Sequence, residues 1–396
     1  MVSVPSCPLC AGRRPFCIHK SYPFPSPTLE KDIQGKLKKD FFGPSYSVFI
    51  GRRGYPNILA GPMLGIEPKE GLDSPSTWFG MDYSKIIELR SFLLRSKKVE
   101  GIRSSSKFVQ EMQELALAKK PADVETSFRR TPQFSFSLSE SFQPMGPSGL
   151  LEKMRVTDNV SIPVRVERIV SDELKAGEQA FLLYQQGMDV YRLASILSSG
   201  TLGLQENKKL VPSRWSVTGV DDIIAKKLMS QVRTYPSVND YIVFESQYLD
   251  NHFVILMMPG SWEFENFEAW APGSNWSTQT QSKIIEEYEP HHGRTSYAES
   301  QAGGYYAARL PAVRYLDSVK RQARVISFRE VGEGYSVPLG VWVVRQTAEH
   351  AFKQPPKRFA TIEEALNYCD SLLRIPIQAY KKQSRILQQR RLTEWA

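Results

Sequence analysis

The sequence predicts an α+β protein with mixed sheets and packed helices. Runs with strand alternation and runs with helical periodicity follow one another along the 396 residues, without the regular strand–helix–strand spacing of a doubly wound sheet. Hydrophobic residues make up 41% and charged residues 23% of the chain, which is the balance of a folded globular protein. A chain of this length can form two or three domains, each with its own core.

Changes in composition divide the chain into four parts. The start is rich in Cys and Pro and has little periodicity, which is typical of a small metal-stabilised module followed by a linker. A turn sequence at residues 146–149 separates two longer regions. We therefore predict a zinc-binding module with its linker at 1–30, α+β regions at 31–150 and 151–375, and a C-terminal helix with an extended tail at 376–396.

The elements of the first half follow from short periodic runs. Apolar pieces separated by Gly and Pro predict strands with tight turns over residues 41–65. Apolar stripes at helical spacing predict one helix over 82–96 and another over 108–120. Alternating residues predict strands at 133–142 and 160–171.

The second half begins with helices and continues as a sheet. Two helical runs stop at Gly187 and Gly200. A loop then leads to a helix whose start is marked by Asp221 and Asp222. Beyond residue 240 the predicted elements are three consecutive strands, a helix and a strand within 301–331, a strand and a helix within 335–352, and a helix at 361–373.

The charge of the chain favours a polyanionic partner. Lys and Arg outnumber Asp and Glu by 51 to 42, which gives a net charge of +9. Charge of this size also serves solubility alone. Local basic groups stand beside aromatic or aliphatic residues, which is compatible with a surface that follows phosphates; they lie at 51–54, 95–98, 128–130, 320–324 and 381–391.

Nothing in the sequence predicts a membrane segment. There is no run of about 18 apolar residues, and the first residues lack the apolar core of a signal peptide. We therefore expect a cytoplasmic protein without a membrane partner.

A metal site is predicted near the N-terminus. Cys7, Cys10, Cys17 and His19 form the pattern C-x2-C-x6-C-x-H, and zinc takes four such ligands in a closed structural site. Cys369 is a more distant alternative for the fourth ligand. The alternative interpretation is that Cys7, Cys10 and Cys17 are free thiols that bind no metal.

Catalytic residues are harder to predict. No P-loop, zinc-protease, nucleophile-elbow or kinase motif occurs. Asp221, Asp222 and Glu245 are candidates for a divalent-cation site of a nuclease. Aspartates at a helix start are also ordinary caps, so whether the protein is an enzyme stays open.

Two short stretches are candidates for nucleic-acid binding. Arg214 stands beside Trp215, and this pair can fork a phosphate or stack on a base. Arg52 and Arg53 lie in the first basic group, between two glycines. These four residues are the predicted contacts to DNA.

The chain ends on residues that suggest a docking peptide. Gln389, Leu392 and Trp395 are spaced three apart, and one 3₁₀ turn would place the leucine and the tryptophan on one side. This pattern resembles the PCNA-interacting peptide that holds the sliding clamp, although its second aromatic is Ala396 here. Alternatively, the segment is an amphipathic last helix that docks on the protein's own body through Ile386, Leu387 and Leu392.

Nearly the entire chain resembles the Nre family of archaeal DNA repair proteins. The resemblance rests on the early cysteines, on "SVFIGRRGYPNILAGPM" and "LVPSRWSVTGVDD", and on the terminal "QRRLTEWA". It implies DNA damage repair, a zinc module and a clamp-binding peptide. The ligands would be Cys7, Cys10 and Cys17, with His19 where the family has a fourth cysteine, and the peptide would be Gln389, Leu392, Trp395 and Ala396.

The sequence thus favours a DNA repair factor that binds the PCNA sliding clamp and DNA. A metal-dependent nuclease is one alternative. A nucleotide-modifying enzyme, with a pocket between the two halves lined by Arg214, Trp215 and tyrosines, is another.

Overall fold

The computed structural model confirms the α+β class and describes residues 27–134, 145–272, 283–335 and 338–389. The predicted zinc ligands Cys7, Cys10, Cys17 and His19, and the tail residues Leu392, Trp395 and Ala396, lie outside this range. The predicted strand at 133–142 does too, apart from its first two residues.

Two compact units make up the chain, and they meet at residues 224 and 225. We call them the barrel unit, with described residues 27–134 and 145–224, and the sheet unit, with described residues 225–272, 283–335 and 338–389. The division lies within helix α7 (Ser213–Val232), whereas the sequence placed a boundary at residue 150. That position falls inside strand β5 (Ser148–Val156), which closes the barrel.

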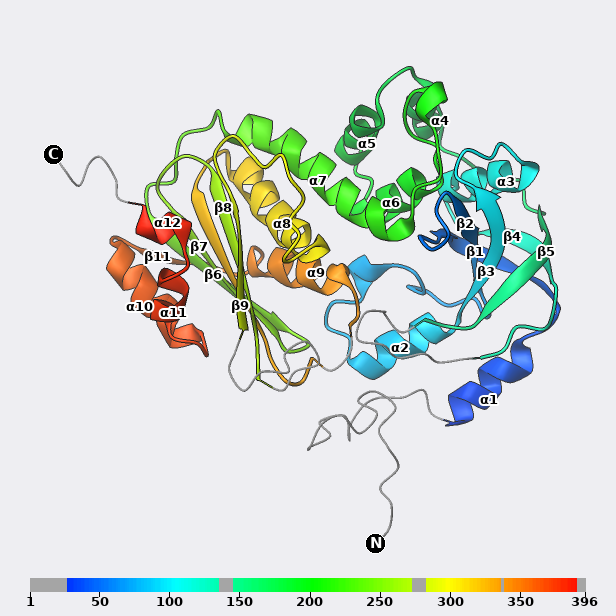
Figure 1. Cartoon of the computed structure of the whole chain (residues 1–396), viewed down its shortest axis with the longest axis horizontal. Coiled ribbons are helices and arrows are strands. Elements are labelled where there is room, and N and C mark those ends of the chain that lie inside the picture. Colours follow the sequence, from blue (N-terminus) through cyan, green and yellow to red (C-terminus); the bar gives the residue numbers. More distant parts are fainter. Residues whose placement is uncertain (1–26, 135–144, 273–282, 336–337, 390–396) are drawn as a thin grey trace, which may run out of the picture. The chain divides into compact units, whose positions relative to one another are not determined.

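Five strands of the barrel unit form a closed barrel in the order β1-β2-β3-β5-β4 (Figure 1). All neighbours are antiparallel except β3 and β5, which are parallel. The strands are β1 (Asp40–Ile50), β2 (Asn57–Gly65), β3 (Leu93–Gly101), β4 (Ala122–Phe128) and β5.

Strand β1 belongs to both sides of the barrel. Its first half, residues 40–45, pairs with β4, and its second half, residues 45–50, pairs with β2 after an irregularity between Ser45 and Ser47. Helix α3 (Lys107–Leu117) follows β3 and packs against β1, β2 and β5. A five-stranded barrel of this order, with a helix between the third and fourth strands, has the topology of an OB-fold.

The remaining helices of the barrel unit correct two predictions. The predicted helix at 82–96 ends early, because α2 (Tyr83–Ser91) gives way to β3, whose Leu94 is buried in the barrel. The predicted strand at 160–171 is wrong, since α4 (Val164–Ser171) follows Pro163. Val166, Ile169 and Val170 are the buried residues of α4, and their spacing of three and four is helical rather than alternating. The unit also contains α1 (Pro27–Lys36), α5 (Ala176–Gln185), α6 (Val190–Ser198) and the start of α7.

The sheet unit is built on six strands in the order β11-β6-β7-β10-β8-β9. Only β8 and β10 are parallel, and every residue of β7 and β10 is buried. The strands are β6 (Tyr241–Tyr248), β7 (Asn251–Met258), β8 (Glu263–Trp270), β9 (Lys283–Glu289), β10 (Arg324–Val331) and β11 (Lys357–Phe359).

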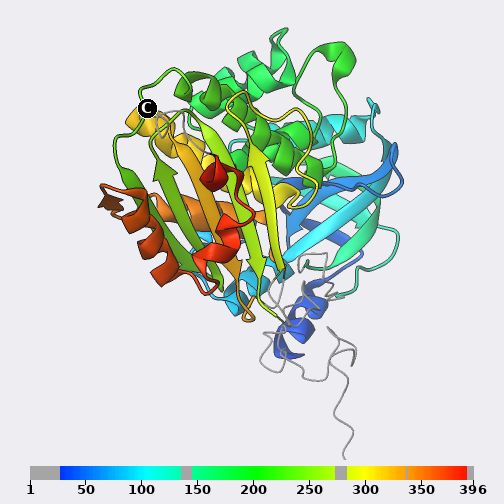
Figure 2. The same cartoon turned by 60° about the vertical axis from the view of Figure 1, so that its left-hand side comes forward.

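Helices cover both faces of this sheet. Helices α8 (Gly303–Val319) and α9 (Val341–Ala351) lie on one face in Figure 1. Figure 2 shows the red and orange helices across the other face, where α10 (Ile362–Leu372) is followed by α11 (Ile377–Lys381) and α12 (Arg385–Gln388). None of the described helices combines the length and the apolar character that crossing a membrane requires.

Candidate nucleic-acid interface and the anchor of the tail

The loop between β1 and β2, residues 51–56, is a tight and exposed turn. Asn57 donates its backbone N–H to the carbonyl of Gly54 at 2.8 Å. Gly54 has a φ of +81°. A Cβ atom at this position would lie 2.6 Å from the backbone oxygen of Asn57. Only glycine fits this turn without strain. The turn carries Arg52 and Arg53, both exposed.

The start of α7 meets this loop. The hydroxyl of Ser213 accepts the backbone N–H of Ile50, the last residue of β1, at 3.0 Å. Two residues further on, the ring of Trp215 lies against the ring of Tyr55, with 5.5 Å between centroids and planes inclined by 50°. Trp215 is 48% exposed and Tyr55 is 44% exposed. The two rings therefore form a continuous aromatic surface that is open to solvent.

We call Arg52, Arg53, Tyr55, Arg214 and Trp215 the aromatic–arginine patch. Its arginines lie on the two segments that the ring contact joins, and the first turn of α7 adds the positive end of a helix dipole. Exposed rings can stack on bases, and guanidinium groups can fork phosphates.

The four residues predicted from the sequence thus lie on segments that are in contact. Tyr55 was missed, although its place after the second glycine of "GRRGYP" was a usable signal. A tyrosine in such a short polar turn is unable to bury its ring in the hydrophobic core, and Tyr55 is 44% exposed.

The candidate catalytic carboxylates lie on two elements. Asp221 is fully buried and Asp222 half-buried in the middle of α7, not at its start as predicted, because the helix already begins after Pro212. Glu245 is on β6 of the sheet unit and accepts a hydrogen bond of 2.9 Å from the Nε2 atom of His252. Within the described part of the chain, no three His, Cys, Asp or Glu side chains are grouped to hold a metal ion.

Helix α12, which leads into the tail, is docked on the sheet unit. Its N-cap residue Ser384 accepts the backbone N–H of Leu387 and donates its own hydroxyl proton to Glu265. Glu265 is fully buried and also accepts the backbone N–H of Arg385 at 2.6 Å. Burial raises the pKa of Glu265 to about 7, and the neighbouring charge of Glu286 adds to the rise. A buried carboxyl group therefore caps the last described helix.

Arg324 on β10 completes the anchor. Its Nη2 atom donates to the carbonyl of Ile386 at 2.8 Å and to the side-chain oxygen of Gln389 at 3.0 Å, while its Nε atom donates to Glu263 at 3.2 Å. Ile386 is buried and Leu387 half-buried. The predicted docking of a last helix on the protein's own body thus holds for α12.

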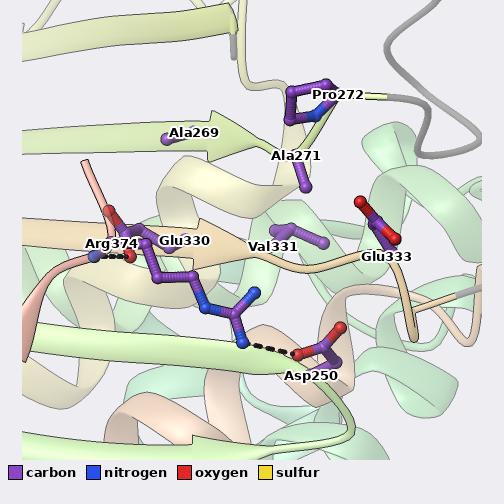
Figure 3. Close-up of a pocket in the computed structure, with 8 residues that line it drawn as sticks. All are labelled: Asp250, Ala269, Ala271, Pro272, Glu330, Val331, Glu333 and Arg374. Carbon is purple, nitrogen blue, oxygen red and sulfur yellow. Dashed lines mark hydrogen bonds and ion pairs between the residues drawn. The ribbon is translucent and has the colours of Figure 1, made fainter. Parts of the chain in front are cut away.

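The sheet unit also contains a pocket of about 360 Å³ beside the end of β10. Figure 3 shows Arg374 reaching Asp250 across it, at 3.2 Å. Glu330 accepts the backbone N–H groups of Arg374 and Ile375 and the hydroxyl of Tyr380. Asp250 and Glu330 thus have hydrogen-bonding partners within the protein, and these contacts stabilise the fold.

Cys369, the distant alternative for a zinc ligand, lies in the hydrophobic core of the sheet unit. Burial raises the pKa of its thiol to about 12. Zinc binds the thiolate form, so this thiol is better suited to packing than to metal ligation.

Comparison with known proteins identifies the family. Residues 16–277 match the family described as "Archaeal Nre, N-terminal", and residues 289–395 match "Archaeal Nre, C-terminal". The chain belongs to the Nre family. This confirms the resemblance drawn from the sequence. No solved structure matches the Nre chain.

Three curated relatives are similar over most of their lengths. DNA repair protein NreB of Archaeoglobus fulgidus is 32% identical over 98% of this chain and 99% of its own length. DNA repair protein NreA of the same organism is 35% identical over 81% of this chain and 82% of its own. DNA repair protein NreA of Haloferax volcanii is 31% identical over 90% of this chain and 87% of its own.

Proposed function

We propose that this Nre protein acts in DNA repair, that it binds DNA through the aromatic–arginine patch, and that its tail binds the PCNA sliding clamp. The names of its relatives support the role in repair. The contact between Tyr55 and Trp215 carries the proposal for DNA, because it joins the two segments that bear the arginines.

The patch combines the two interactions that nucleic acids offer. Neutralising a phosphate with arginine releases counterions and gives salt-dependent affinity. Stacking a base on an aromatic ring contributes about 1–3 kcal/mol and tolerates any sequence. A repair factor that meets damage in any sequence needs affinity of this kind.

The tail is proposed as the tether. Gln389 would be the glutamine of the clamp peptide, with Leu392, Trp395 and Ala396 as its apolar part. Helix α12 fixes the chain up to Gln389 on the sheet unit, which gives the peptide a defined point of departure. A short ordered plug of this kind is expected to bind with micromolar affinity.

The cysteines at the N-terminus complete the proposal. Cys7, Cys10, Cys17 and His19 would hold one structural zinc ion, since a closed set of four ligands leaves no position for a substrate. Zinc content of the purified protein, measured by atomic emission with and without Cys10→Ser, tests this part.

DNA binding is tested by fluorescence anisotropy with a labelled DNA of about 30 nucleotides. We expect Tyr55→Ala with Trp215→Ala to weaken binding at least about tenfold, and the exposed aromatic variant Phe42→Ala to leave it unchanged. Equal affinity for the double variant and the unchanged protein would refute the assignment of the patch.

Clamp binding is tested separately by calorimetry with an archaeal sliding clamp. We expect binding that disappears when residues 390–396 are removed and that is retained by the Tyr55→Ala, Trp215→Ala variant. Binding that survives the deletion would exclude the tail as the tether.

A further inference from the structure

We propose that the protein binds single-stranded DNA, which runs from the aromatic–arginine patch across the outer surface of strands β2, β3 and β5. This inference rests on the DNA binding proposed above. The surface is a row of four side chains, Leu59, Val99, Lys97 and Leu150, which we call the outer row. Of these residues only Lys97 belongs to a basic group of the sequence, at 95–98, and no relative's name assigns a role to any of the four.

The topology of the barrel places the patch beside this surface. OB-fold barrels bind oligonucleotides across their second and third strands, with the loop between the first and second strands at one edge. In this chain that loop is residues 51–56, which carry Arg52, Arg53 and Tyr55. The sequence motif and the topology therefore indicate the same edge of the barrel.

Strand register makes the outer row continuous. Leu59 on β2 lies opposite Val99 on β3, and Lys97 follows on the same side of β3 because side chains alternate along a strand. Lys97 lies beside Leu150 in the parallel pairing of β3 with β5. The residues on either side of Lys97 point the other way, since Ser96 is fully buried and Lys98 lies over the ring of Phe108 on α3 at 4.7 Å.

The outer row is more exposed than apolar side chains of a barrel usually are. Val99 is 64% exposed and Leu150 is 48% exposed. Lys97 stands between them and donates from Nζ to the hydroxyl of Ser148 at 2.8 Å, so its charge is held at a fixed place. The row thus alternates apolar surface with a fixed cation, which suits bases lying flat beside a phosphate backbone.

Lys97 has a further property that fits an anionic ligand. Burial and the charge of Arg95 lower its pKa to about 8. A phosphate beside the ammonium group would favour the charged form and reverse part of this shift. Arg95 itself lies over the ring of Phe49 at 5.0 Å, so a second cation is held on the same strand.

The chemistry of the row favours a single strand over a duplex. In a duplex the bases present only their edges, in the grooves. Leu59, Val99 and Leu150 have no hydrogen-bonding groups with which to read such edges, whereas they can cover the flat faces of unpaired bases. The exposed rings of Tyr55 and Trp215 also need the flat face of an unpaired base on which to stack.

The test compares an oligothymidylate of about 30 nucleotides with a duplex of the same length, using the full chain and fluorescence anisotropy. We expect the single strand to bind at least about tenfold more tightly than the duplex. Val99→Glu with Leu150→Glu should weaken single-strand binding about tenfold or more, through like charge and lost stacking. Lys97→Gln should lower the dependence of log affinity on log salt by about 0.7 for the single strand.

The matched control is Val164→Glu on α4, because Val164 is 70% exposed in the same unit and should tolerate the charge without effect. Thermal melting checks that all variants are folded. If patch variants lose DNA affinity while the single strand and the duplex bind equally, or while the Val99→Glu, Leu150→Glu variant binds normally, the single-strand proposal is overturned and the proposed function survives. If the unchanged protein binds neither DNA, both proposals fail.

Discussion

The guanidinium group of Arg324 holds the side chain of Gln389, the residue that opens the proposed clamp peptide, through a hydrogen bond of 3.0 Å. The same nitrogen holds the carbonyl of Ile386, and Glu263 fixes the guanidinium from the other side. A clamp that binds the glutamine of the peptide must therefore replace an existing partner. In the proposed function, the anchor and the clamp would therefore compete for one side chain.

Arg324→Ala is expected to increase clamp affinity by about three- to tenfold, because one hydrogen bond, here from the guanidinium group to the exposed amide of Gln389, contributes about 1 kcal/mol. Calorimetry with the clamp measures this change, and hydrogen exchange at residues 384–389 shows whether α12 opens. Arg321→Ala, an exposed arginine of the same segment, is the control and should change neither. An unchanged or weaker clamp affinity in Arg324→Ala would show that the anchor does not compete.

Glu265 should make the stability of the sheet unit depend on pH. Its folded pKa is about 7 against 4.5 for the ordinary carboxyl, so the folded state binds the proton more tightly. The extra stability is fully present below pH 4.5 and is lost as the pH rises through about 7. The rise of the Glu265 pKa from 4.5 to about 7 corresponds to about 3 kcal/mol of unfolding free energy.

Urea unfolding of the sheet unit at several pH values between about 4.5 and 8 measures this effect. Glu265→Gln should flatten the slope, because an amide does not titrate. Glu299→Gln, an exposed glutamate of the same unit, should retain it. A slope that persists in Glu265→Gln would assign the pH dependence to another group.

Local patterns predicted much of the secondary structure and every member of the patch except Tyr55. The helix at 361–373 was predicted correctly because α10 combines a helical stripe with a capping box between Thr361 and Glu364. The pairing of Arg214 with Trp215 in the sequence predicted a nucleic-acid contact, and both side chains are exposed. Such features depend on a few neighbouring residues and are therefore visible in the sequence.

Long-range pairing was not predictable in the same way. The parallel pairing of β3 with β5 places Arg95 beside Ser148, although α3 and β4 lie between these two residues in the sequence. No local signal encodes this pairing. The barrel topology, and with it the meaning of the β1–β2 loop, depends on that contact. The hydrogen bond between Arg324 and Gln389 is equally remote in sequence.

Salt dependence should separate the two kinds of contact in the patch. Removing both charges by Arg52→Gln and Arg53→Gln should lower the slope of log affinity against log salt by up to about 2, because each phosphate contact contributes nearly one. Trp215→Ala should weaken binding at every salt concentration and leave the slope unchanged. Arg165→Gln on α4, which is exposed, is the charge control. An unaltered slope in the double arginine variant would mean that these arginines do not contact phosphates.

The shape of the β1–β2 loop should matter as much as its charge. Gly54→Ala would place a Cβ 2.6 Å from the oxygen of Asn57 at a positive φ of 81°, which we expect to cost about 1–3 kcal/mol of unfolding free energy. DNA affinity should fall although Arg52, Arg53 and Tyr55 are all retained, because the loop can no longer present them. Gly101→Ala at the same end of the barrel has its nearest neighbour at 3.7 Å, so it is expected to bind DNA normally. Chemical unfolding and anisotropy on both variants measure the two effects, and normal DNA affinity in a destabilised Gly54→Ala variant would show that the turn positions nothing for the ligand.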